Sequence, residues 1–170
     1  MSFCIGLLLP ANTPDAVLKT LAEKYITEED WYQLTEIHEP HMTEGLEGER
    51  LFFVPHPQGG MDNSYTGIGS RPLLHMPFPK NLGLPLWREL EWRREFSQRK
   101  QRCRKDVKLW AKAIRYLMKE VRSVGVFTFM CEEDPRCWEY PSAEYPLDGL
   151  LEKHLIDLEV YHVVRFRKNK

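Results

Sequence analysis

The chain lacks the short motifs that announce the commonest catalytic and cofactor sites. It has neither a GxxxxGK[ST] nor a GxGxxG phosphate-binding loop, no GxSxG nucleophile elbow and no HExxH zinc motif. It also lacks paired cysteines, because the four cysteines stand far apart or without a CxxC spacing, at positions 4, 103, 131 and 137. This usage excludes the dense disulfide framework of a small secreted domain and predicts reduced thiols in a cytoplasmic protein.

Long apolar runs are missing as well. The opening run, Phe3 to Leu9, has seven residues and no preceding positive cluster, so it suits neither a membrane span of roughly 20 residues nor a signal peptide. We therefore expect a soluble protein with no membrane partner. With 170 residues, of which 42% are hydrophobic, the chain is predicted to form a single domain, residues 1–170, with its own core.

Charge is present in plenty but unevenly divided. Residues 87–122 carry thirteen Lys/Arg against five Asp/Glu, while the whole chain has a formal net charge of −1. The rest of the chain must therefore carry about −9, which the near-neutral total conceals. A pI near 6.6 counts against a dedicated nucleic-acid-binding domain, since such domains are usually basic overall.

The basic segment has the periodicity of a long amphipathic helix. At roughly 100° per residue, one narrow arc collects an apolar stripe that should face the core: Cys103, Val107, Trp110, Ile114, Leu117 and Val121. The opposite side collects the basic residues Arg104, Lys105, Lys108, Lys112, Arg115 and Lys119. Upstream, Arg99 and Lys100 interrupt the apolar arc, which predicts a bend, or an emergence from the core, at residues 97–102. A single helix from Pro85 to Arg122 would be roughly 57 Å long, so its first turns should project or meet a partner.

The remaining elements are shorter. Strands are predicted at residues 3–9, 31–38, 50–54, 124–130 and 155–167, and a helix is predicted to start near Pro14 with Thr13 as its cap. This order predicts an α+β fold: one two-layer domain with a mainly antiparallel sheet, compatible with a ferredoxin-like βαββαβ core plus an edge strand. Residues 55–85 are rich in proline and glycine and are predicted to form a long loop packed on the body.

Histidines are the main candidates for catalysis or metal binding. His38, His41 and His56 stand among carboxylates in the middle of the chain. A His38-Glu39-Pro40-His41 stretch supplies two nitrogen ligands, whereas zinc needs three or four converging ligands. Neither a resident metal nor a cofactor is predicted, and these histidines support only an alternative in which the protein is a small hydrolase or nuclease.

The favoured prediction is a non-enzymatic protein that binds another protein, in an immunity-protein-like or inhibitory role. A nucleic-acid-binding module using the basic helix is a further alternative. Two aromatic residues in an acidic loop join the basic residues as typical interface material. The candidate partner-binding residues are Arg93, Arg94, Arg99, Lys100, Arg104, Lys105, Lys108, Lys112, Arg115, Lys119, Trp138 and Tyr140.

Overall fold

The structure is a computed structural model that describes residues 3–26, 34–54, 67–80, 82–130 and 133–168. Its centre is a six-stranded sheet with the strand order β2-β3-β1-β4-β6-β5. The strands span Phe3–Pro10 (β1), Thr35–Ile37 (β2), Glu49–Val54 (β3), Ser123–Met130 (β4), Ser142–Pro146 (β5) and Val163–Arg167 (β6). All neighbouring strands are antiparallel except β5 and β6, which are parallel.

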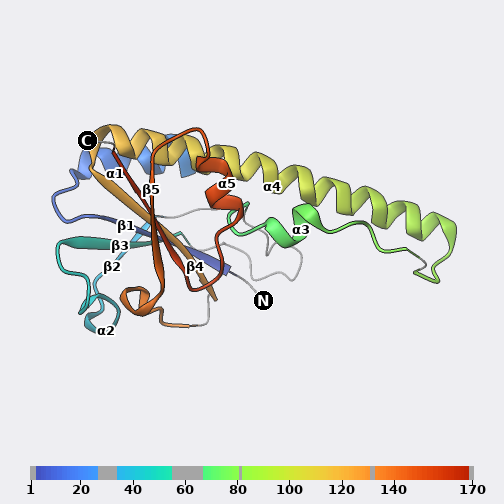
Figure 1. The fold of residues 1–170 in the computed structure, drawn as a ribbon, viewed down its shortest axis with the longest axis horizontal. Helices are drawn as coiled ribbons and strands as arrows, with labels where there is room; N and C mark the ends of the chain where they lie inside the picture. Colours follow the sequence, from blue (N-terminus) through green and yellow to red (C-terminus); the bar gives the residue numbers. More distant parts are fainter. Residues whose placement is uncertain (1–2, 27–33, 55–66, 81, 131–132, 169–170) are drawn as a thin grey trace.

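Helices lie mainly on one face of this sheet (Figure 1). They span Asp15–Leu21 (α1, continued by a π-helical turn, Ala22–Ile26), Pro40–Thr43 (α2), Arg71–His75 (α3), Leu86–Glu120 (α4) and Leu151–Ile156 (α5), with a 3₁₀ turn at Cys137–Glu139 (η2). The path β1-α1-β2-β3-α4-β4 together with the order β2-β3-β1-β4 is the predicted ferredoxin-like arrangement. The α+β prediction is therefore confirmed.

Alternation along the strands gives the sheet two buried faces. In β1, Ile5, Leu7 and Leu9 point to the helices and join the core formed with α1, α4 and α5. Cys4 and Leu8 point the other way and join a smaller cluster with Phe127, covered by residues around α2 and η2. Both faces are thus closed, which explains why β1 and β4 read as continuous apolar runs.

Three sequence predictions were wrong in detail. Residues 155–167 are not one strand, because α5 occupies their beginning and β6 only their end. Residues 132–149, an acidic stretch predicted as a loop, contain η2 and the exposed strand β5. Thr13 does not cap α1, since its hydroxyl donates to the carbonyl of Pro10 at 2.6 Å and Pro14 stands at the cap.

The cysteines also depart from expectation. Cys4 is disulfide-bonded, whereas a free thiol was predicted there. Cys103 and Cys137 are free and buried, so Cys137 is not bonded to Cys131, which lies outside the described residues. Disulfides are rare in cytosolic proteins, so the bond at Cys4 counts against the cytoplasmic location expected from cysteine usage.

The helix α4 is one unbroken element of 35 residues. All of its buried side chains lie at Cys103 or beyond. Five of the eight were predicted to face the core, and the other three, Ala111, Ala113 and Met118, flank that arc. Residues 86–102, here named the arm, bury none and extend past the edge of the sheet (Figure 1). The predicted emergence from the core therefore occurs, without a break in the helix.

Candidate partner-binding surface

The outer side of α4 carries a line of basic residues beyond the arm. We name this set the basic face, and all of its members are exposed: Arg104, Lys105, Lys108, Lys112, Arg115 and Lys119. Their steps of one, three and four residues keep them in one angular sector of the helix. Among the described residues, none of the six side chains makes an ion pair. The face is therefore a row of unneutralised positive charge, roughly 22 Å long at 1.5 Å per residue.

The inner side of α4 explains why this face is fixed in place. Val107, Ile114 and Leu117 are 0–1% exposed and pack in the main core. Asp106, the one acid between residues 103 and 119, accepts a hydrogen bond from the backbone N–H of Gly67. That carboxylate therefore holds the segment that begins at Gly67 against α4. The helix cannot rotate its charges away from solvent without exposing core residues.

Two of the predicted partner-binding residues in the arm are used within the molecule. The guanidinium of Arg93 pairs with Glu89 at 2.7 Å and lies 4.5 Å from the ring centre of Phe78. The ammonium of Lys100 donates to the carbonyls of Leu74 (3.1 Å) and Met76 (2.6 Å). Both cations hold the segment after α3 against the arm, so they are less available to a partner than the basic face.

The other two basic residues predicted in the arm differ from each other. Arg99 is half-buried where α4 leaves the core, and Arg94 is exposed. Only Arg94 therefore extends the charge of the basic face toward the tip of the arm.

The two aromatic candidates pack in the smaller core cluster. The ring of Trp138 covers Gly45 so closely that a Cβ there would meet it at 2.5 Å. Tyr140 stands edge-on to Phe127, with ring centres 5.9 Å apart, and burial raises its pKa to about 12. Both residues are half-buried and cover the smaller core cluster, on the face of the sheet opposite α4, so they stabilise the fold.

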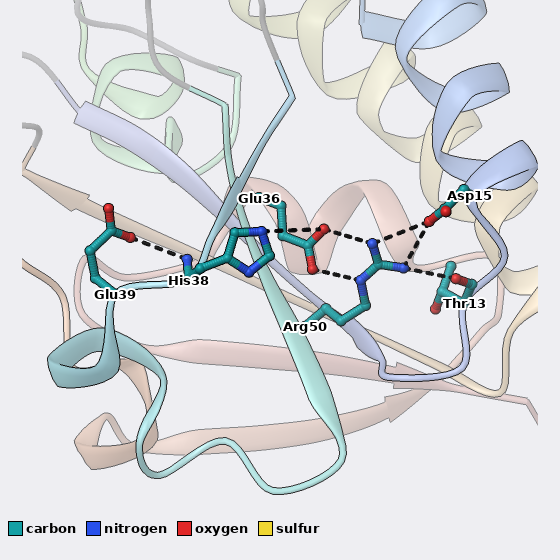
Figure 2. Close-up of polar contacts among 6 residues, drawn as sticks. All are labelled: Thr13, Asp15, Glu36, His38, Glu39 and Arg50. Atoms are coloured by element: carbon teal, nitrogen blue, oxygen red, sulfur yellow. Dashed lines mark hydrogen bonds and ion pairs between the residues drawn. The ribbon is translucent and has the colours of Figure 1, made fainter.

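The histidine region is organised by Arg50 (Figure 2). Its guanidinium donates to both oxygens of Glu36, at 2.7 and 2.6 Å, to the carbonyl of Thr13 at 2.9 Å and to Asp15 at 3.3 Å. The hydrogen bond from Arg50 lowers the pKa of Glu36, and the same bond raises the pKa of Arg50. This cluster links α1, β2 and β3, so its ion pairs stabilise the fold.

The candidate histidines do not share a carboxylate. His38 lies 4.0 Å from Glu36, whose oxygens are already committed to Arg50, while His41 lies 3.4 Å from Asp134. Their side chains are 78% and 54% exposed, so neither is held in a desolvated pocket. His56 lies outside the described residues. Within the parts of the chain that are described, no group of three or more His, Cys, Asp or Glu side chains is arranged to hold a metal ion.

A shallow hollow of about 310 Å³ lies between β5, α5 and the start of β6. It contains His154, whose ring stacks on Tyr145 at 3.8 Å, and His162, which lies 3.8 Å from Glu159. Sequence reasoning missed this pair because β5 itself was not predicted. The volume is at the lower limit for a small-molecule site, and His154 is already engaged by stacking.

Comparison with protein-family models, with curated proteins and with solved structures gives no match for this chain. Across the described residues, no helix combines the length and the apolar character needed to cross a membrane, α4 included. The function must therefore be inferred from the side chains themselves.

Proposed function

We propose that the protein is a non-enzymatic binding protein that captures an acidic partner protein through the basic face of α4. The observation that carries this proposal is the row of six exposed Lys and Arg side chains without ion pairs to described residues. Aligned like charges repel one another, and a chain that only needed a soluble helix would gain by interspersing acids at i+4. A partner with carboxylates along the row would relieve this repulsion.

The physical effect of such a row is greatest on association. A line of charge steers an oppositely charged protein toward the correct face and raises the association rate, while misdocked like-charged surfaces are rejected. The two arginines add bidentate geometry for carboxylates, and the lysines add point charges with long reach. Fast, charge-guided capture is what an immunity-like or inhibitory protein requires, and we include that role in the proposal.

An acidic protein is favoured over nucleic acid by the rest of the chain. Outside residues 87–122 the formal charge is about −9, so a polyanion longer than the basic face would be repelled by its surroundings. A compact acidic patch on a protein can match a face of roughly 22 Å. The hydrolase alternative has no support in the described geometry, because His38 and His41 face different carboxylates.

The test is affinity capture from the native host with a charge-reversal variant, Lys108→Glu, Lys112→Glu, Arg115→Glu. A matched control reverses three exposed basic residues elsewhere, Lys24→Glu, Arg136→Glu, Lys153→Glu, and changes the net charge by the same amount. We expect the control to retain the partner and the α4 variant to lose it. Both variants should unfold at the same temperature as the natural protein, since exposed charges contribute little to stability.

Two results would overturn the proposal. Capture that is unchanged by reversal on α4, or lost equally in both variants, would remove the basic face as the binding surface. If the protein binds generic DNA or RNA with a steep salt dependence, and only the α4 variant loses this binding, the basic face binds nucleic acid instead of an acidic protein.

A further inference from the structure

The tip of the arm carries an unusual concentration of exposed apolar side chains. Among the described residues, six large hydrophobic side chains are exposed, and four of them lie within residues 86–92. Leu86 is 72% exposed, Trp87 66% and Leu90 57%, and we name these three residues the apolar tip. Clustered apolar groups of this kind mark interaction sites, whereas single exposed ones need no explanation.

The apolar tip and the basic face occupy the same side of α4. At roughly 100° per residue, Leu86 and Leu90 fall in the sector that contains Arg104, Lys108 and Arg115. Trp87 falls at the edge of that sector, in line with Lys105. The outer side of α4 is thus one continuous strip, roughly 50 Å long, that is apolar at its N-terminal end and basic at its C-terminal end.

The strip is held straight before any partner arrives. Phe78 packs edge-on against Phe96, with ring centres 5.6 Å apart, on the side of the arm away from the apolar tip. Arg93 lies over the Phe78 ring and Lys100 over the Phe96 ring, at 4.5 and 4.8 Å from their centres. These contacts stabilise a helix that would be marginal alone, so little conformational entropy remains to be lost on binding.

We infer that the outer strip of α4 docks one amphipathic helix of an acidic protein, with apolar residues over the tip and carboxylates over the basic face. The inference rests on the proposed function. It adds that the partner segment is a helix and says which of its ends lies over the tip. Side chains spaced by three and four residues in a single sector match the spacing on a facing helix. A segment of about 33 residues, apolar at one end and acidic over the rest, would cover the strip.

Exposed carboxylates beside the tip favour this partner over a phosphate surface. Glu91 and Glu95 are exposed on the flank of the arm and would repel nucleic acid or anionic lipid brought close to Leu90. A helix that is apolar where it meets the tip places no charge beside them. Its carboxylates would begin beside Arg94, which extends the charge of the basic face, and continue from Arg104, roughly 21 Å beyond Leu90.

The experiment uses three synthetic helical peptides with a terminal fluorophore. The first has leucines at two positions four residues apart near one end and glutamates at steps of three and four over the rest. The second replaces glutamate by glutamine, and the third replaces the leucines by serine. Binding to the full chain is followed by fluorescence anisotropy. Quenching of tryptophan emission is compared for fluorophores on the apolar and the acidic ends, and a Trp87→Phe variant isolates the share of Trp87 among the five tryptophans.

We expect only the first peptide to bind tightly, with stronger Trp87 quenching from its apolar end. Leu86→Ser with Leu90→Ser should weaken binding at least about tenfold at any salt concentration, since two buried leucines are lost. Leu150→Ser, at another exposed leucine, is the matched control and should bind normally. The charge-reversal variant should also weaken binding and flatten its salt dependence.

The outcomes separate this inference from the proposed function. Binding that survives loss of the two leucines but not charge reversal overturns the tip inference and leaves the proposed function standing. Binding that survives both sets of changes overturns both. Failure of the first peptide to bind, or tighter binding to duplex DNA or to phosphatidylserine vesicles, overturns the inference of a helical acidic partner.

Discussion

The pairing of Arg50 with Glu36 makes a stability prediction that depends on pH. Both side chains are mostly buried, 20% and 25% exposed, and the guanidinium binds both carboxylate oxygens (Figure 2). Glu36→Gln keeps the size of the side chain but removes its charge and one acceptor. A hydrogen bond between charged partners contributes about 1.5–3 kcal/mol, so we expect the variant to lose about 2 kcal/mol of unfolding free energy at neutral pH.

The sign of the pH dependence follows from the lowered pKa of Glu36. In the folded protein the bond from Arg50 keeps this carboxylate ionised below its ordinary value of 4.5, while in the unfolded chain it takes up a proton near that value. The stabilisation is therefore complete above about pH 4.5 and is lost as the pH falls through the folded value. Glu36→Gln has no such titration, so its deficit should shrink in acid.

Urea unfolding curves, followed by tryptophan fluorescence at a series of pH values, measure this difference directly. Glu47→Gln is the matched control, because Glu47 is exposed and makes no ion pair with described residues. We expect the control to unfold like the natural protein at every pH. A Glu36→Gln deficit below about 0.5 kcal/mol at neutral pH, or one of constant size down to pH 3, would refute the assignment of a stabilising ion pair.

Two further predictions test the sheet and the buried thiols. A Cβ on Gly6 would overlap the fully buried ring of Phe127, so Gly6→Ala should lower the free energy of unfolding by about 1–3 kcal/mol, and Phe127→Leu should restore part of it. An unchanged urea midpoint for Gly6→Ala would contradict this packing. Burial raises the pKa of Cys103 to about 11 and that of Cys137 to about 12, so iodoacetamide at about pH 8 should alkylate both only in denaturant; rapid labelling of the folded protein, seen by mass spectrometry, would contradict their burial.

The parts of the fold that could be predicted are those whose signal is local. The strands β1, β3 and β4 are short apolar runs, and α4 has its buried residues at helical spacing, so composition and period were sufficient. The strand β5 could not be found in this way. Four of its five residues are exposed, and it depends on parallel backbone pairing with β6, which is distant in sequence.

The short helix α5 was missed for a different reason. Leu151 and Leu155 stand four residues apart and are both fully buried, so a helical signal was present. The apolar residues that follow in β6 merged with it and gave the impression of one strand. A turn at Asp157–Tyr161 separates them, and Tyr161 adopts the left-handed conformation that a non-glycine residue enters mainly in turns.

The exposure of the basic face could be predicted from the sequence, but the contacts of the neighbouring cations could not. Angular sorting found the basic face correctly, because side-chain direction in a helix follows from position alone. It could not predict that Arg93 would lie over the ring of Phe78. Nor could it predict that Lys100 would donate to the carbonyls of Leu74 and Met76, because these partners belong to a different segment. Only tertiary contacts decide which cations in a basic helix remain available.

The polar interruption at Arg99 and Lys100 acquires a physical meaning from these contacts. The core ends at Cys103, and one helical turn earlier Lys100 satisfies the carbonyls of the chain that leaves α3, so the helix continues where no sheet supports it. An arm of seventeen residues that buries none of its own side chains contributes little to folding, yet cation–π and edge-on aromatic contacts keep it straight. Its exposed leucines and tryptophans place apolar surface in water without stabilising the fold, and the proposed partner helix would cover that surface.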